Sequence, residues 1–346
     1  MLPVYGSGLR PVHCTAPVVH YPLMLQPRFL FSFFAAAALI VACAPEGEQD
    51  DPAAAGDATE PTEATEQDVT AGAGRRVCSW NLRRLGNQFD QRPKDMKSAA
   101  KIVKDNCDLV AIEEDMATAN AGNAGYDDLL KALGSRYWGG LATSKPAPFP
   151  QTSNSEHYAF FFRKSAVSIC EGFGAEARRL PDPEDIYLRE PAFGCFKFKS
   201  SEHELVLAGY HAIFGEPAER KREVGFLDDD NDNDGTKDDL FNLMKASRPG
   251  TEPDVVLVGD FNLNANDLKD VLPRYVDHTI GNGSTLNDQD GISGNQYDHV
   301  VVMADARMIT AGTKPAEVLD VRAQHEPGVS FYRSVSDHLP IRFTMK

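Results

Sequence analysis

The chain has 346 residues, 42% hydrophobic and 25% charged, a balance typical of a globular fold rather than a fibrous or disordered one. Its formal net charge of −16 excludes a broadly basic nucleic-acid coat protein. This charge does not exclude an enzyme that uses metal ions to approach phosphate, and the length allows one large domain or two small ones.

Residues 1–42 are predicted to be a targeting segment. They contain two basic residues and no acid, and the apolar run 29–42 follows Arg28 directly. Such a run is too short to span a membrane comfortably but matches the core of a signal peptide. Residues 1–23 lack the character of a signal-peptide n-region, so translation is expected to begin at Met24.

The end of this run resembles a bacterial lipoprotein signal, because aliphatic and small residues precede Cys43. The resemblance implies cleavage and lipidation at Cys43; ordinary cleavage nearby, with a free cysteine, is the alternative. Residues 43–74 contain nine acids and no base, which predicts an extended acidic linker. The protein is therefore expected to be exported and held on a membrane by lipid alone, periplasmic or on the cell surface, or else secreted.

Residues 75–346 carry the strand and helix patterns of one folded domain. The predicted strands are 76–81, 108–112, 158–162, 167–173, 193–198, 205–211, 255–259, 297–303 and 339–345. The predicted helices are 92–106, 219–227 and 239–247. The first two strands enclose a helix and should be parallel. Both halves of residues 75–346 are rich in predicted strands with helices between them, which predicts two packed sheets with helices outside.

Four cysteines lie in this domain, in an exported context that permits disulfides. None has a spacing typical of zinc sites. Cys170 and Cys195 lie in successive predicted strands and are the favoured pair, which leaves Cys78 with Cys107.

Polar residues recur where the apolar strands begin or end, which is where α/β folds place their sites. They are Asn81, Glu113, Glu114, His211, Asp260, Asn262, Asp298, His299, Asp337 and His338. Carboxylates with histidines but no cysteine suit hard cations such as Mg²⁺, Mn²⁺ or Ca²⁺. Two histidines also allow one general base and one general acid.

Eight segments, taken in order, give these residues a family context. They are SWNLRRLG (79–86), DLVAIEE (108–114), EHYAFFFR (156–163), REPAF (189–193), GYHAI (209–213), VGDFN (258–262), YDHVVV (297–302) and SDHLPI (336–341). Together they resemble the endonuclease/exonuclease/phosphatase superfamily, in its deoxyribonuclease I-like branch. The resemblance covers residues 75–346 and implies a four-layer α/β/β/α sandwich of two mixed sheets with outer helices.

The resemblance also implies a metal site. Glu114 matches a metal-ligating carboxylate, Asn81 helps to hold that metal, and Asp337 completes the site. Asp260 matches a residue that grips phosphate or metal. Mg²⁺ or Mn²⁺ is the cofactor implied.

Two histidine–carboxylate pairs are implied as the catalytic groups. His211 is oriented by Glu156, and His338 by Asp298. One imidazole would remove a proton from water while the other protonates the departing oxygen, and each carboxylate would fix a tautomer. Which histidine is the base is left open.

Substrate contacts are implied for three further residues. Asn262 matches a residue that grips phosphate, and Arg189 matches an arginine that contacts the substrate backbone. Arg83, with Arg84, either contacts phosphate or lies on the solvated surface. His299, Glu113 and His157 are interpreted as neighbouring surface or supporting residues.

Two departures weaken the match to a minor-groove reader of duplex DNA. Met116 stands where deoxyribonuclease I has an arginine that enters the minor groove, and Asn154 replaces a tyrosine that packs on the sugar. The catalytic centre is thus better supported than the substrate.

The expected function is a tethered, metal-dependent phosphodiesterase, most simply a nuclease acting as a monomer without an obligate protein partner. DNA and RNA, and endo- and exonucleolytic cleavage, all fit these motifs. The alternatives are a phospholipid or sphingomyelin phosphodiesterase, a sugar or inositol phosphatase, or a calcium-dependent surface binding protein on an inactive scaffold.

An Asp-rich insert at 228–239 resembles the start of a calcium loop, D-x-D-x-D-G. The candidate ligands are Asp230, Asp232, Asp234 and Asp238. Phe241 stands where a complete EF-hand would have Glu. We expect structural Ca²⁺ there, against the alternative of a solvated acidic loop.

Calcium should accordingly raise the melting temperature through this insert. The measurement is thermal unfolding with Ca²⁺ and with EDTA, for wild type and for Asp232→Ala/Asp234→Ala. The calcium-dependent rise should disappear in the double variant; an equal rise in both proteins would disprove the site.

Overall fold

The chain divides into two units, Met1–Thr65 and Glu66–Lys346, and the structure, a computed structural model, describes residues of the second. The described ranges are 75–86, 94–116, 124–147, 155–182, 185–201, 204–228, 240–248, 253–281, 283–303 and 316–345. The predicted signal, linker and lipidated Cys43 lie outside them, as do the proposed calcium ligands Asp230, Asp232, Asp234 and Asp238. No helix within these ranges is long and apolar enough to cross a membrane.

The first sheet contains seven described strands in the order β11-β13-β14-β1-β2-β4-β3. In chain order they are β1 (Arg75–Leu85), β2 (Leu109–Met116), β3 (Trp138–Ala142), β4 (Glu156–Arg163), β11 (Thr279–Ile280), β13 (Ala316–Val318) and β14 (Ile341–Met345). β1 and β2 are parallel, as predicted, and α1 (Met96–Asn106) connects them. β14 and β4 flank this pair antiparallel, so the sheet is mixed.

The second sheet has the order β10-β12-β9-β8-β7-β5, with β6 paired to β7. Its described strands are β5 (Val167–Ile169), β6 (Arg178–Arg179), β7 (Ala192–Phe198), β8 (Glu204–His211), β9 (Asp254–Asp260), β10 (Tyr275–Asp277) and β12 (Asp298–Met303). β8 and β9 are parallel, and the remaining pairs are antiparallel. The segment between β8 and β9 contains α3 (Pro217–Gly225), a 3₁₀ turn (Phe226–Asp228) and α4 (Leu240–Ala246).

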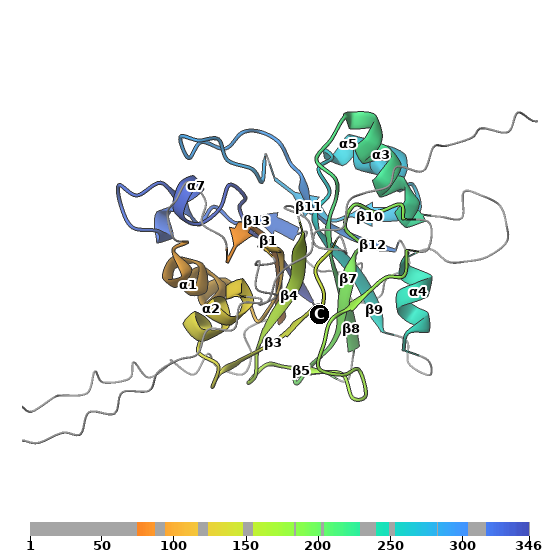
Figure 1. The fold of residues 1–346 in the computed structure, drawn as a ribbon, viewed down its shortest axis with the longest axis horizontal. Coiled ribbons are helices and arrows are strands. Elements are labelled where there is room, and N and C mark those ends of the chain that lie inside the picture. Colours follow the sequence, from red (N-terminus) through yellow and green to blue (C-terminus); the bar gives the residue numbers. More distant parts are fainter. Residues whose placement is uncertain are drawn as a thin grey trace, which may run out of the picture. The chain divides into compact units, whose positions relative to one another are not determined.

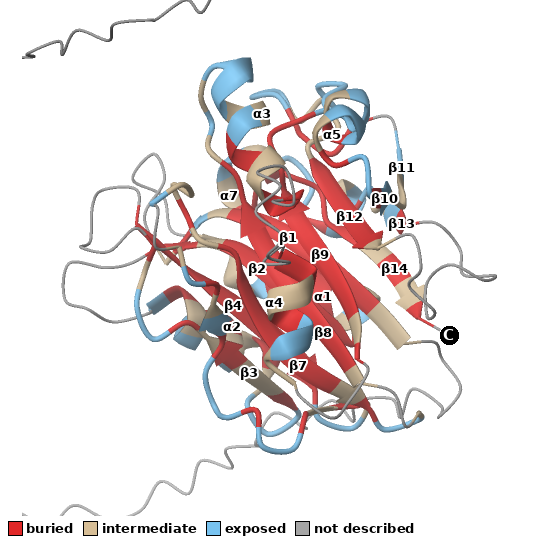
Figure 2. Cartoon of the chain, turned by 90° about the vertical axis from the view of Figure 1, so that its right-hand side faces the viewer, coloured by how far each residue is buried: buried red, intermediate tan, exposed pale blue. Residues whose placement is uncertain are grey.

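The two sheets pack face to face with helices on their outer sides (Figure 1). The side chains of β4 alternate between the two faces of its sheet, so both faces are covered. Phe160 and Phe162 belong to the core between the sheets, whereas Phe161 packs with the residues of α1 and α2 (Ala124–Leu133). α3, α4 and α5 (Ala265–Val271) lie beside the second sheet, and the strands are buried while the outer helix faces are exposed (Figure 2). The predicted sandwich of two mixed sheets with outer helices is confirmed.

Some predicted boundaries were wrong, for local reasons. The strand predicted at 167–173 ends at Ile169, because Phe173 N donates to Cys170 O and closes a turn. The helix predicted from residue 92 begins at Met96, where the Asp95 side chain accepts a hydrogen bond from Ser98 N as an N-cap. Several elements were not predicted: α2, β3, β6, β10, β11, β13, α5 and α7 (Phe331–Ser334).

Two disulfides are present among the described cysteines, Cys78–Cys107 and Cys170–Cys195, which confirms the favoured pairing. The first joins β1 to the end of α1, and the second joins the turn after β5 to β7. Their loops of 29 and 25 residues correspond to about 3–4 kcal/mol each in the chain-entropy description of the unfolded state.

Candidate active site

Three neighbouring strands of the second sheet carry ionisable side chains at the edge of the sheet where these strands end or begin. In the β8–β9 register His211 lies opposite Asp260, and in the β9–β12 register Asp260 lies opposite Asp298. β8 and β9 end at this edge because they are parallel, and β12 begins there because it is antiparallel. The predicted convergence of strand ends therefore arises directly from the pairing.

A β-bulge after Ile112 contributes the carboxylate of Glu114 from the first sheet. It shifts the register of β2 against β4, a second irregularity lies in β1 between Asn81 and Leu85, and Glu114 has a φ of 58°. This conformation lets the carboxylate accept hydrogen bonds from Asn81 Nδ2 (3.1 Å) and from the backbone N of Arg84 (2.9 Å). Both oxygens of Glu114 are thereby oriented.

Asn81 links the two sheets across the site. Its Nδ2 lies 3.4 Å from Asp260 Oδ2 as well as near Glu114, and its Oδ1 accepts from the backbone N of Arg83 (2.8 Å). Asn81 is fully buried, so these bonds satisfy an amide that burial would otherwise destabilise. The predicted metal residues Asn81, Glu114 and Asp260 are therefore joined in one network.

The two predicted histidine–carboxylate pairs are present. His211 Nδ1 lies 2.8 Å from Glu156 Oε1, and His338 Nδ1 lies 2.8 Å from Asp298 Oδ2. The Nε2 atoms of His211 and His338 lie 3.8 and 3.5 Å from the same atom, Asp260 Oδ2. Because each Nδ1 is bonded to a carboxylate, each Nε2 is the nitrogen presented to the site.

The electrostatics of the site favour protonated histidines. Burial lowers the pKa of His211, but the charge and hydrogen bond of Glu156, together with the charge of Glu114, outweigh this and raise the pKa overall. Burial also opposes the charge of His338, but Asp298 and Asp260 hold its pKa well above the usual value. Burial raises the pKa of Asp260, although the nearby imidazolium of His338 acts in the opposite direction.

Three hydroxyl groups that sequence analysis missed orient these residues. Tyr158 Oη accepts from the backbone N of His211 (3.0 Å), and Ser284 Oγ accepts from the backbone N of Asp298 (3.1 Å). Ser336 Oγ accepts from His338 N and donates to Asn81 O (2.6 Å). Tyr158 and Ser336 lie inside the EHY and SDH segments, whose spacing was the available signal.

Arg189 lies behind the first pair rather than on an open surface. It is 8% exposed, its Nε lies 3.2 Å from Glu156 Oε1, and its Nη1 lies 3.5 and 3.4 Å from the carbonyl oxygens of His211 and Ala212. In this arrangement it positions the Glu156–His211 pair. Its contact with substrate stays a prediction.

Asn262 has a φ of 51°, a conformation that Asn tolerates better than most residues. Its backbone N donates to Asp260 Oδ1 (2.9 Å), and its Nδ2 donates to Ala212 O (2.9 Å). These bonds connect the ends of β8 and β9, and the grip of Asn262 on phosphate stays a prediction.

Asp337 provides the oxygen that best fits a cation. Its Oδ1 is buried and accepts no hydrogen bond, while its Oδ2 lies 3.1 Å from Arg83 Nε. Asp337, Glu114 and Asn81 all carry hard oxygen donors, the type that Mg²⁺ and Mn²⁺ prefer. The residues present therefore fit a divalent cation.

Arg83 is not solvated surface, one of the two alternatives considered from the sequence. Besides pairing with Asp337, its guanidinium lies 4.2 Å from the ring centroid of Tyr332.

Lys94, which sequence analysis missed, donates from Nζ to Val335 O (2.6 Å). Burial lowers the pKa of Lys94 to about 8, although Asp337 and Glu114 oppose this.

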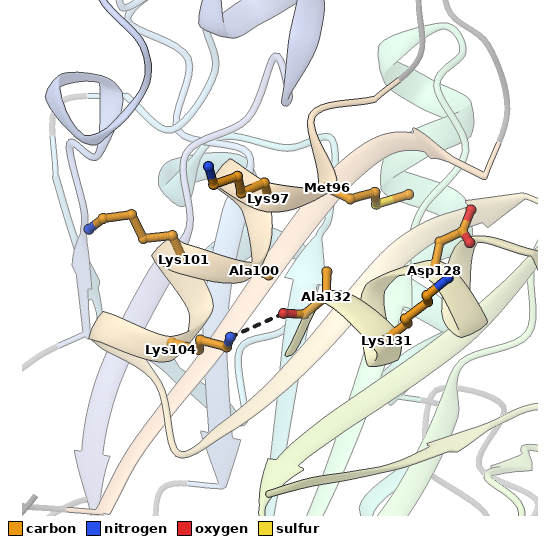
Figure 3. Close-up of a pocket in the computed structure, with 8 residues that line it drawn as sticks. All are labelled: Met96, Lys97, Ala100, Lys101, Lys104, Asp128, Lys131 and Ala132. Atoms are coloured by element: carbon orange, nitrogen blue, oxygen red, sulfur yellow. Dashed lines mark hydrogen bonds between the residues drawn. The ribbon is translucent and has the colours of Figure 1, made fainter. Parts of the chain in front are cut away.

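Two other features do not form a catalytic site. A groove of about 690 Å³ between α1 and α2 is lined by Met96, Lys97, Ala100, Lys101, Lys104, Asp128, Lys131 and Ala132, with no histidine–carboxylate pair (Figure 3). Cys170, Cys195 and Glu204 lie close together, but the two cysteines form a disulfide and offer no thiolate to a metal.

His299 is a supporting residue, as the sequence interpretation allowed. Its Nδ1 lies 2.8 Å from Asp277 Oδ2, and its Nε2 lies 2.8 and 3.0 Å from the carbonyl oxygens of Leu263 and Gln296. Three acceptors around a fully buried imidazole favour its charged form. Burial lowers the pKa of His299, but Asp277 outweighs this and raises it overall.

Asp277→Asn should therefore destabilise the protein in a pH-dependent way. Breaking a buried ion pair costs about 3–5 kcal/mol. The loss should be largest between about pH 4 and pH 6.5, and should shrink as the pH rises through the raised pKa of His299. Urea unfolding at pH 6 and pH 9 measures it.

The matched control is Asp320→Asn, which removes an exposed carboxylate paired with Arg322. It should change the free energy of unfolding by less than about 1 kcal/mol. A loss for Asp277→Asn that is equal at both pH values would contradict the charged state assigned to His299.

No protein-family model matches the chain. A deoxyribonuclease from Thioalkalivibrio sp. (strain K90mix) is 27% identical over 279 residues, covering 78% of this chain and 70% of that protein. Deoxyribonuclease-1-like 2 from Mus musculus is 26% identical and covers 60% of this chain and 69% of its own length.

Among solved structures, an endonuclease/exonuclease/phosphatase family protein from Bacteroides thetaiotaomicron has the same fold. Its TM-score is 0.53 at 17% identity, covering 79% of this chain and 94% of that one. The fold, the order of the motifs and the deoxyribonuclease relatives agree. The chain therefore has the fold of the endonuclease/exonuclease/phosphatase proteins and is similar in sequence to deoxyribonucleases of the deoxyribonuclease I-like branch.

Proposed function

We propose that the protein is a divalent-metal-dependent phosphodiesterase that hydrolyses nucleic acid, in the manner of a deoxyribonuclease. One observation carries the proposal: two histidines, each oriented by its own carboxylate, present their Nε2 atoms to the same oxygen of Asp260. The names of the relatives support nucleic acid as the substrate and DNA in particular.

Hydrolysis forms a bond from phosphorus to a water oxygen and breaks the bond to the departing oxygen. Because the pKa values of both histidines are raised, the imidazole that acts as base must first lose its proton; its Nε2 then accepts the proton of the water, and the other, protonated imidazole donates a proton to the departing oxygen. Glu156 and Asp298 stabilise the charged form of His211 and His338 during these transfers. The structure treats the two histidines alike in this respect, so either order of base and acid fits it.

Glu114, Asn81 and Asp337 would hold Mg²⁺ or Mn²⁺, with Asp260 at the border between metal and histidines. A bound cation would supply positive charge to the phosphate, whose negative charge grows during attack. Arg83 lies beside Asp337 and would add positive charge at the same end of the site.

Hydrolysis should require both histidines and a divalent metal. His211→Ala and His338→Ala should each lower turnover by about 10²–10⁴-fold, the usual contribution of general acid–base catalysis. EDTA should abolish turnover, and Mg²⁺ or Mn²⁺ should restore it. The measurement is a panel of plasmid DNA, single-stranded DNA, RNA, sphingomyelin and inositol phosphates.

The matched control is His325→Ala, which removes a buried histidine bonded to Ser98 and Ser334 and has no assigned catalytic part. Full activity of either catalytic variant would remove the acid–base assignment. Release of phosphate or a lipid headgroup without cleavage of nucleic acid would move the same residues to the phosphatase or phospholipase alternative.

The protein is further proposed to be an exported lipoprotein anchored through Cys43, on the strength of the apolar run before that residue. Cys43→Ala should move the protein from the membrane fraction to the soluble fraction. Cys14→Ser is the control, because residue 14 precedes the expected start at Met24. Membrane association that survives Cys43→Ala would exclude this anchor.

A further inference from the structure

An exposed phenylalanine stands at the rim of the candidate active site. Phe214 is 76% exposed, more than any other large hydrophobic side chain in the described ranges, and it follows His211 by three residues. A single exposed hydrophobic residue is ordinary on a protein surface. The position of Phe214 is what makes it informative, because three residues of extended chain span at most about 10 Å.

An arginine lies between Phe214 and a second ring. The guanidinium carbon of Arg220, on α3, is 5.7 Å from the ring centroid of Phe214 and 6.0 Å from that of Tyr297. Arg220 Nη1 donates to Asn262 O (2.7 Å), and its Nε is buried without a hydrogen-bond partner. Phe214, Arg220 and Tyr297 are called the rim cluster below.

Each member of the rim cluster is tied to one of the three strands that form the site. Phe214 lies in the loop after β8, which ends at His211. Tyr297 directly precedes β12, which begins at Asp298. Arg220 bonds to Asn262, two residues after the end of β9. The cluster therefore adjoins the edge of the sheet at which His211, Asp260 and Asp298 lie.

A ring and a guanidinium side by side suit a flat, electron-rich ligand attached to an anion. Bases stack on aromatic side chains whatever their sequence, and arginine adds attraction to both the base and its phosphate. A sugar phosphate or a lipid headgroup lacks such a flat face. This chemistry points to a nucleotide whose base is accessible.

We propose that the rim cluster is a base-stacking subsite, in which Phe214 supports the base next to the scissile phosphate. The proposal rests on nucleic acid being the substrate and specifies which form is preferred. In a closed duplex both faces of each base are covered by neighbouring bases, so Phe214 can stack only on an unpaired one. The enzyme should therefore favour single-stranded or locally opened strands over closed duplex.

The experiment combines a protein variant with removal of the bases. Steady-state kinetics are measured on an oligo-dT strand and on an all-abasic deoxyribose-phosphate strand of equal length. For wild type the abasic strand should have the higher KM. In Phe214→Ala the ratio of the abasic KM to the dT KM should fall about 10-fold, equivalent to about 1.4 kcal/mol, within the range of one base–aromatic stack.

Two further variants serve as controls. Phe214→Trp should keep the wild-type KM ratio, and dT should quench its fluorescence in EDTA while the abasic strand does not. Tyr137→Ala removes another exposed aromatic ring that has an arginine, Arg136, 5.5 Å from its centroid, in the turn before β3. It should behave as wild type.

The possible outcomes separate this subsite from the proposed function. Cleavage of dT with an unchanged KM ratio in Phe214→Ala overturns the subsite and leaves the nuclease assignment intact. Hydrolysis of another phosphate ester with no cleavage of dT overturns both. Loss of binding to phosphatidylglycerol vesicles in Phe214→Ala, with an unchanged KM ratio, assigns the ring to a lipid surface and overturns the subsite.

Discussion

A single buried carboxylate organises the site. Asp260 Oδ2 lies within 4 Å of the Nε2 atoms of both histidines and within hydrogen-bonding distance of Asn81 from the other sheet. Burial makes this charge costly and raises the pKa of Asp260, while the two histidines and the backbone N of Asn262 offset part of that cost. The position is possible only because β9 pairs with β8 on one side and β12 on the other, which places His211 and Asp298 opposite Asp260.

The contacts that hold the strand ends together also orient the side chains of the candidate site. The bulge that orients Glu114 interrupts β2, and the loops after β8 and β9 are tied together by Asn262. Glu114 and Asn262 have positive φ values, so the regular backbone is interrupted at both positions. Arg189 contacts Glu156, and the hydroxyl of Tyr158 accepts from the backbone N of His211, so this pair is held in place without a substrate.

The sequence predicted the long strands and the two histidine–carboxylate contacts well, because both have strong local signals. Alternating residues such as Phe160 and Phe161 pack on opposite faces of β4, and charged residues at strand ends have few structural uses. It missed short elements such as α5, whose seven residues carry too little periodicity. It also missed the contacts of Arg83 and Ser336, since the pairing of distant segments decides which partners their side chains meet.

The central claim is that the two histidine–carboxylate pairs act as one unit around Asp260. The most direct test measures the cleavage rate constant, under saturating metal and substrate, for Glu156→Gln, Asp298→Asn and the double variant. The account predicts that the double variant is about as slow as the slower single variant, as is observed when residues act together. Losses that multiply in the double variant would show two independent contributions and contradict it.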